Sequence, residues 1–192
     1  MRAPLVAAGA CALVVLTLVF ASGCGSQGTQ VSVPTPAQAR TELAGSPAAL
    51  AGLHDQAAQL LQGGLSAYHA RIAALKGRPV VVNAWASWCP PCRSEMPYFS
   101  RTAVRLGRRV AFLGVNVSDP GGDARRFLAG HWIPYPSYVD PHYAIADAIG
   151  VRTGLPTTVF YGRDGQVQYV HQGQYASERA LVADVKRYAG AS

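Results

Sequence analysis

Two cysteines separated by two prolines are the residues of this 192-residue sequence whose types and spacing most clearly indicate chemistry. Cys89 and Cys92 follow an apolar run and precede a segment with helical spacing. A disulfide that closes so short a loop adds little stability, because the stabilisation grows with loop length. A structural zinc ion needs four ligands, and neither a second C-x-x-C nor a suitably spaced histidine pair accompanies these cysteines. Reversible oxidation of the two thiols is therefore the favoured interpretation.

The predicted position of Cys89 at the start of a helix favours its thiolate over its thiol. The first backbone N–H groups of a helix have no partner within it, and the positive end of the helix dipole lies there. Pro90 and Pro91 fit the first turn because they lack that N–H, which leaves the amides of Cys92 and Arg93 to face the sulfur of Cys89. Cys92 lies on the same helical face, within reach of a disulfide. We therefore expect Cys89 to attack and Cys92 to resolve.

The elements that must position this pair predict an α/β fold. Four apolar runs have the composition of strands and cover residues 79–85, 109–117, 157–161 and 167–171. Four segments with helical features cover residues 90–107, 123–129, 143–149 and the chain from Ser177 onward. Strands separated by helices favour parallel pairing, while the Gly-rich turn at residues 162–165 predicts an antiparallel hairpin. We expect a mixed central sheet with helices on both faces, and an irregular segment at residues 132–141.

The N-terminal region has a different organisation. Residues 3–23 carry no charge and are dominated by Ala, Leu and Val, which is typical of a signal peptide (residues 1–23). The small residues before Cys24 resemble the lipobox of bacterial lipoproteins, in which cleavage leaves a lipidated cysteine at the N-terminus. An uncleaved membrane span and an unmodified secretory signal are the alternatives, and all three place the remaining chain outside the cytoplasm. Cys11 lies within the signal.

Between the signal and the body, residues 24–46 are rich in Gly, Ser, Thr and Pro and predict a flexible tether. Ser46 and Pro47 have the types of a helix cap and first helical residue. Leucines at helical spacing then predict a helix up to the Gly63-Gly64 stop, and a second helix follows at residues 66–76. Residues 47–76 are therefore expected to be a helical extension of a domain that covers residues 47–192.

The chain has a formal net charge of +7, from 17 Lys and Arg against 10 Asp and Glu. A basic chain can bind nucleic acid or an anionic membrane surface. No run of Lys and Arg, and no basic motif interleaved with aromatic residues, is present. We predict no nucleic-acid partner.

The segment around the cysteines resembles the active site of the thioredoxin superfamily. The motif WCPPC at residues 88–92 follows an apolar strand, and VVVNAWASWC at residues 80–89 is similar to the extracytoplasmic TlpA/ResA branch of thiol-disulfide oxidoreductases. The resemblance covers about residues 75–188, with Pro97 inside the helix and GLPTT at residues 154–158. It implies a thioredoxin-like fold and a cis Leu155–Pro156 bond packed against the cysteine pair. It also implies a substrate-binding surface that pairs with an extended client chain, formed by Trp88, Pro90, Pro91, Leu155 and Pro156.

Two further positions are similar to this branch rather than to cytosolic thioredoxins. Asn83 stands where thioredoxins bury an aspartate and cannot act as a base, so we expect a buried polar group with its hydrogen bonds satisfied. Glu95 follows Cys92 by three residues, as in the TlpA/ResA branch, and can point toward the sulfurs. Burial would raise the pKa of Glu95 toward a useful range. Our hypothesis is that Glu95 takes the proton from Cys92 during turnover.

Together, the residues and the resemblance predict a lipoprotein anchored to the outer face of the cell membrane that exchanges thiols and disulfides. It needs no metal or organic cofactor, since the Cys89–Cys92 disulfide is itself the redox centre. The predicted direction is reduction of disulfides in exported proteins. The resemblance implies a membrane thiol transporter as the electron donor and apocytochrome c among the clients. Two alternatives are an oxidase that forms disulfides and a chaperone that holds Cu(I) with Cys89, Cys92 and His171.

Overall fold

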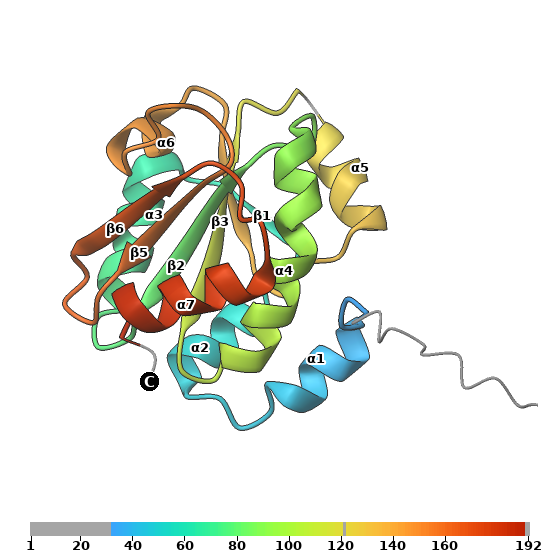
Figure 1. Cartoon of the computed structure of the whole chain (residues 1–192), viewed down its shortest axis with the longest axis vertical. Helices are drawn as coiled ribbons and strands as arrows, with labels where there is room; N and C mark the ends of the chain where they lie inside the picture. The colour runs from blue at the N-terminus through green and yellow to red at the C-terminus, as the bar shows by residue number, and fades with distance from the viewer. Residues whose placement is uncertain (1–31, 121, 191–192) are drawn as a thin grey trace, which may run out of the picture. The chain divides into compact units, whose positions relative to one another are not determined.

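A six-stranded mixed sheet forms the centre of the computed structural model, which describes residues 32–120 and 122–190 (Figure 1). The strand order is β1-β4-β3-β2-β5-β6. The first four of these strands are parallel to one another, and β5 and β6 are antiparallel to their neighbours. In chain order the strands are β1 (Leu60–Leu61), β2 (Val80–Trp85), β3 (Ala111–Val117), β4 (Ser137–Asp140), β5 (Thr157–Tyr161) and β6 (Val167–Gln172). The predicted mixed sheet is confirmed.

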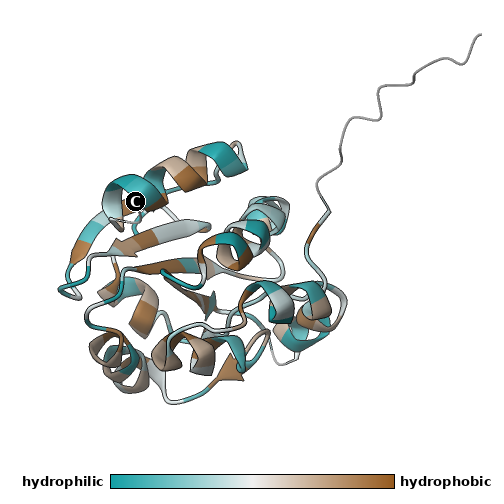
Figure 2. Cartoon of the chain, turned by 90° about the horizontal axis from the view of Figure 1, so that it is seen from below, coloured by the Kyte–Doolittle hydropathy of each residue, from teal (hydrophilic) through white to brown (hydrophobic). Residues whose placement is uncertain are grey.

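Helices cover both faces of this sheet (Figure 1). They are α1 (Pro36–Glu42), α2 (Ala48–His54), α3 (Gly64–Ala74), α4 (Pro90–Leu106), α5 (Asp123–Gly130), α6 (Ala144–Ala148) and α7 (Glu178–Tyr188). One buried cluster joins the sheet to α4, α5 and α7, and a second joins the opposite face to α2, α3 and α6. Figure 2 shows hydrophobic colour on the inner strands and alternating bands along the helices.

Strand β2 explains why two layers of helices are needed. All six of its residues are buried. Val81 and Trp85 point into the first cluster, and Val80 and Val82 point into the second, as the alternation of a strand requires. A strand that is apolar on both faces is stable only between two covering layers, so the loop that follows β2 and leads to Cys89 starts from a firmly held element.

The helix predicted up to residue 62 is wrong beyond His54, where α2 ends. Leu60 and Leu61 instead form β1, paired in parallel with β4. The chain turns at Ala58, which has a φ of 58° and donates its N–H to the carbonyl of Tyr135. Helical spacing of the leucines predicted a longer helix, but hydrogen bonds to a distant segment hold the backbone in another conformation.

Residues 132–141 are not irregular throughout, because β4 occupies Ser137–Asp140. This strand lies between β3 and β1 and is almost entirely buried. It has only four residues and is bordered by prolines at positions 136 and 141. So short a run gives no alternating pattern of its own, and its strand conformation depends on the two neighbours with which it pairs.

The flexible tether predicted for residues 24–46 is wrong from Pro36 to Glu42, where α1 forms. Thr35 and Gln38 form a capping box, in which each side chain accepts a hydrogen bond from the other residue's backbone N–H. The predicted cap at Ser46 is also wrong, since its hydroxyl donates to the carbonyl of Leu43 and Pro47 stands at the N-cap of α2. The signal segment, Cys11, Cys24 and the first part of the tether lie outside the described residues.

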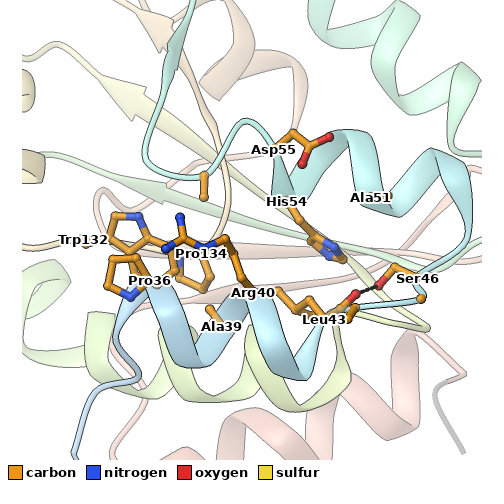
Figure 3. A pocket seen from close by; sticks show the side chains of 13 residues that line it. Pro36, Ala39, Arg40, Leu43, Ser46, Ala51, His54, Asp55, Trp132 and Pro134 are labelled. Atoms are coloured by element: carbon orange, nitrogen blue, oxygen red, sulfur yellow. Dashed lines mark hydrogen bonds between the residues drawn. The ribbon is translucent and has the colours of Figure 1, made fainter.

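A surface groove of about 480 Å³ lies between α1, α2 and the segment that contains Trp132 and Pro134 (Figure 3). Arg40 and His54 also line it. Burial lowers the pKa of His54, and its Nδ1 has no hydrogen-bond partner among the described residues. Neither Cys89 nor Cys92 borders this groove, which is lined mainly by residues 36–57.

Candidate active site

The cysteine pair lies where the chain leaves β2 and begins α4. Cys89 is the N-cap residue of α4 and forms a disulfide with Cys92, with 5.3 Å between their Cα atoms. Cys89 is 3% exposed and Cys92 is fully buried. Cys89 is therefore the one that an incoming client can reach more easily.

One of the two amides predicted to face the sulfur of Cys89 does so. The N–H of Cys92 donates to Cys89 Sγ at 3.3 Å. The N–H of Arg93 instead donates to the carbonyl of Cys89 at 3.1 Å, so that part of the prediction is wrong. An amide one turn into a helix is taken up by the carbonyl four residues before it, which leaves a single amide of the first turn for the sulfur.

The loop after β3 holds the residues that precede Cys89. The carboxylate of Asp119 accepts the backbone N–H of Ser87 at 2.7 Å, the Ser87 hydroxyl, and the side-chain amide of Asn116 at 2.6 Å. The indole N–H of Trp88 donates to the carbonyl of Ser118 at 3.0 Å, while the Trp88 residue stays 53% exposed. Asp119 was not predicted as a functional residue, although an acidic residue in the turn after a buried strand was a usable signal.

Trp85 contributes packing to this region. It is fully buried, and its indole N–H donates to the hydroxyl of Ser137 at 3.0 Å. Gly114 on β3 lies beside it, and a Cβ there would come within 2.1 Å of that hydroxyl. The close approach of β3 to β4 at this point therefore requires glycine.

Glu95 is fully buried on α4, one turn after Cys92. One carboxyl oxygen accepts the side-chain amide of Asn83 at 3.0 Å, and the other accepts the backbone N–H of Tyr175 at 2.9 Å. Burial raises the pKa of Glu95 to about 7, against the opposing effect of these two donors. The predicted rise in pKa is confirmed, and the carboxyl group can gain or lose a proton near neutral pH.

Asn83 is buried, but its hydrogen bonds are only partly satisfied. Its Nδ2 donates to Glu95, whereas its Oδ1 has no partner among the described residues. The expectation of a fully satisfied amide is therefore wrong for the oxygen. Tyr175, which supplies the second donor to Glu95, was not recognised, because the two residues are 80 positions apart in the sequence.

The loop that precedes β5 contains the expected proline. The Leu155–Pro156 peptide bond is cis, as the resemblance implied. Pro156 is buried and its carbonyl accepts the N–H of Gly173 at 2.9 Å. Leu155 is partly buried and packs against both core clusters. Its packing against the cysteine pair stays a prediction.

Among the helices of residues 32–120 and 122–190, none combines the length and the hydropathy of a membrane span. These residues also contain no cluster of three or more His, Cys, Asp or Glu side chains arranged to hold a metal ion. His171 stacks on Tyr175 with 4.0 Å between ring centroids, and its Nδ1 lies 3.9 Å from Asp184. The residues that surround His171 therefore favour a packing role for it.

Three features define this chain as a thioredoxin-fold thiol-disulfide oxidoreductase. A C-x-x-C disulfide lies at the N-terminus of a helix, this helix follows a central strand of the mixed sheet, and a cis-proline loop directly precedes the antiparallel strand β5. Residues 55–188 match the model of the Redoxin family, and the chain belongs to that family. The predicted fold, enzyme class and ResA-like relationship are thereby confirmed.

Two curated relatives illustrate this relationship. The chain is 30% identical over 125 residues to the thiol-disulfide oxidoreductase ResA of Halalkalibacterium halodurans, which covers 65% of this chain and 70% of the relative. It is 38% identical over 99 residues to the thiol:disulfide interchange protein DsbE homolog of Paracoccus denitrificans. This match covers 51% of this chain and 52% of the relative, about half of each.

Solved structures of thiol-disulfide exchange proteins also superpose on this chain. A thiol:disulfide interchange protein DsbE of Chlorobium tepidum superposes with a TM-score of 0.55 at 28% identity, over 61% of this chain and 84% of the other. A secreted disulfide oxidoreductase of Mycobacterium tuberculosis superposes with a TM-score of 0.54 at 26% identity, over 60% of this chain and 85% of the other.

Proposed function

We propose that this chain reduces disulfides in exported proteins, with Cys89 as the attacking thiolate and Cys92 as the resolving thiol. The observation that carries the proposal is the position of Cys89 at the N-cap of α4, where its sulfur accepts the N–H of Cys92. The same contact stabilises a sulfur anion in the reduced state. Cys92 is buried behind it, out of reach of a client but within reach of Cys89.

The reaction transfers two electrons in two exchanges. The Cys89 thiolate attacks one sulfur of the client disulfide, which forms a mixed disulfide and releases the other client sulfur as a thiolate. The Cys92 thiolate then attacks Cys89 Sγ, which closes the Cys89–Cys92 disulfide and releases the second client thiolate. The client is reduced and the enzyme is oxidised.

Glu95 accepts the proton that Cys92 must lose before it attacks. Its carboxyl group is buried one turn along the same helix, with a pKa raised to about 7 by burial. A base is most useful when its pKa lies near the working pH. In this scheme the Cys92 S–H bond breaks, the proton moves to Glu95, and the negative charge moves to the sulfur.

The client binds beside the cysteines on a surface formed by Trp88, Pro90, Pro91, Leu155 and Pro156. Trp88 supports this role because it is a large exposed aromatic residue whose indole is held by Ser118. An extended client chain pairs with the backbone at Leu155. The chemistry uses no metal or organic cofactor.

Location and partners follow from the resemblance to the TlpA/ResA branch and from the N-terminal sequence. Cleavage before Cys24 and lipidation of this residue would anchor the domain to the outer face of the cell membrane, and the relative from Mycobacterium tuberculosis is itself secreted. A membrane thiol transporter would return electrons to the disulfide. Cytochrome c maturation, with apocytochrome c as the client, is the pathway that this branch suggests.

The test is to trap the client with Cys92→Ser in membranes of the producing cell. The variant should accumulate mixed disulfides with exported proteins, because the resolving sulfur is absent. Cys89→Ser is the matched control and should trap none. Absence of adducts in Cys92→Ser would overturn the roles of the two cysteines.

The direction is tested by equilibration of the purified protein with glutathione buffers. A reductase should have a potential near that of thioredoxin, about −270 mV, and a potential near that of DsbA, about −120 mV, would favour the oxidase instead.

A further inference from the structure

Three buried polar atoms, on Asn83, on the residue opposite Asn83 in β5 and on Tyr135, have no hydrogen-bond partner in the part of the chain that the structure describes. They are Asn83 Oδ1, Thr158 Oγ1 and the phenol oxygen of Tyr135. Asn83 and Thr158 are directly opposite each other in the β2–β5 pair, so their side chains share one face of the sheet. Burial and, to a lesser extent, the charge of Glu95 raise the pKa of Tyr135. Asn83, which is bonded to the carboxyl group of Glu95, therefore has an unused acceptor.

The two protonation states of Glu95 need opposite partners. A carboxylate only accepts hydrogen bonds, whereas a carboxylic acid also has one O–H to donate. The observed donors, Asn83 Nδ2 and the N–H of Tyr175, suit the carboxylate. The N–H of Tyr175 can never accept. A buried acid therefore needs an acceptor elsewhere, because an unpaired buried donor is unfavourable.

Asn83 can provide that acceptor without a change in the backbone. Its amide carries a donor and an acceptor on the same carbon, and a half turn about the Cβ–Cγ bond exchanges their places. Among the described residues, the amide side chain is bonded to Glu95 alone. Its neighbours in the sheet are Gly114, which has no side chain, and Thr158, whose hydroxyl can both donate and accept.

We propose that Asn83 is the positioning residue that pairs with Glu95 in both of its protonation states, donating to the carboxylate and, after a half turn of the amide, accepting from the carboxylic acid. The inference rests on the proposed role of Glu95 as the proton acceptor for Cys92. When the Cys92 S–H bond breaks and an O–H bond forms on Glu95, the amide turns, and it turns back when the proton leaves. No electrons move in this step.

Two tyrosines interact electrostatically with Glu95, and a cysteine lies near it along the same helix. Cys92 lies one turn before it on α4, Tyr135 precedes β4, and Tyr175 precedes α7. In the oxidised protein Cys92 does not titrate, and burial raises the pKa of both tyrosines. Oxidised protein therefore isolates the titration of Glu95 from that of these neighbours.

The test is a double-mutant cycle in the oxidised protein with Asn83→Leu, Glu95→Met and the double variant, unfolded by urea at pH 5 and pH 9. If Asn83 pairs with both protonation states of Glu95, the fall in the urea midpoint of the double variant is smaller than the sum of the falls in the two single variants. This holds at pH 5 and at pH 9. Additive losses at pH 5 would show that Asn83 serves the carboxylate alone and would overturn the proposal. Additive losses at both values would overturn it as well.

Thr102→Val combined with Glu95→Met is the matched control. Thr102 is another buried side chain on α4 whose hydroxyl has no partner among the described residues, but it lies two turns from Glu95. The fall in urea midpoint caused by Thr102→Val should add to that caused by Glu95→Met at both pH values. Coupling as large as that of Asn83 would mean that the cycle reports general repacking, and this would overturn the proposal.

A second measurement applies if Asn83→Leu does not fold. The side-chain amide signals of Asn83 in the wild-type protein should shift with the same pH midpoint as the Glu95 carboxyl carbon and stay protected from solvent exchange on both sides of it. Glu95→Gln should abolish the shift. An amide that does not respond, or that exchanges rapidly at low pH, contradicts the pairing. Client trapping by Cys92→Ser does not depend on Asn83, so failure of the proposed function is seen separately.

Discussion

Replacement of Glu95 by glutamine should remove most of the dependence of stability on pH between pH 4.5 and pH 7. Burial raises the pKa of Glu95 from 4.5 to about 7 in the folded protein, whereas the unfolded chain titrates near the lower value. Between these two pH values the folded protein holds one proton that the unfolded chain has released. Stability therefore depends on the proton concentration in this window.

The sign and size follow from the same two values. The stabilisation is fully present below pH 4.5 and is lost as the pH rises through 7, because the folded state binds the proton more tightly. At about 1.4 kcal/mol for each tenfold change in proton affinity, the loss amounts to about 3 kcal/mol. The substituted glutamine side chain stays neutral at every pH and resembles the protonated acid. The variant should match wild type at pH 4.5 and exceed its free energy of unfolding by about 3 kcal/mol at pH 9.

Urea unfolding of the oxidised protein, followed by tryptophan fluorescence, measures this difference. Subtraction of the two curves cancels other groups that titrate in the same range, such as His54, whose pKa burial lowers. Glu42→Gln, at an exposed position of α1, is the control and should follow the wild-type curve. Parallel curves for wild type and Glu95→Gln would refute the argument, because Glu95 would then titrate alike in the folded and unfolded states.

Three further substitutions test the surroundings of the site. Asp119→Ala should lower the free energy of unfolding by about 2 kcal/mol, since the carboxylate accepts three hydrogen bonds in a partly buried loop; an unchanged urea midpoint would contradict this. Trp88→Ala should lower the free energy of unfolding by less than about 1 kcal/mol, because the residue is 53% exposed. In steady-state reductase assays it should raise KM for a protein client and leave kcat unchanged. Ser177→Ala should lower the free energy of unfolding by about 1 kcal/mol, because the serine hydroxyl no longer accepts the N–H of Ala180 to cap α7. The rate of thiol exchange should not change, and a slower exchange would mean that α7 influences the site.

The sequence was most informative where local pattern and tertiary environment agree. The strands β2 and β3 are continuous apolar runs, and such runs are stable only when buried on both faces. The hairpin of β5 and β6 was predicted from a Gly-rich turn, and α7 from helical features in the chain from Ser177 onward. At the site, C-x-x-C at the start of a helix predicted a disulfide, and the disulfide is present.

Elements that depend on distant partners were missed or misplaced. The strands β1 and β4 have two and four residues, which is too short for a period to be recognised. Conversely, α1 was overlooked because it lies in a segment rich in small and polar residues, although its capping box is visible in the sequence as Thr35 and Gln38. Boundaries of this kind are decided by caps and by hydrogen bonds between segments rather than by composition.

By itself, the sequence determined the pair of cysteines, the helix that begins beside them and the acidic residue one turn further on, since all three depend on spacing along a single helix. Only the tertiary structure decided how that acidic residue behaves. Burial in the folded protein raises the pKa of Glu95 to about 7, and the two hydrogen-bond donors of its carboxyl group come from residues 12 and 80 positions away. Desolvation is a property of the packed core, so no local pattern of residues could specify it.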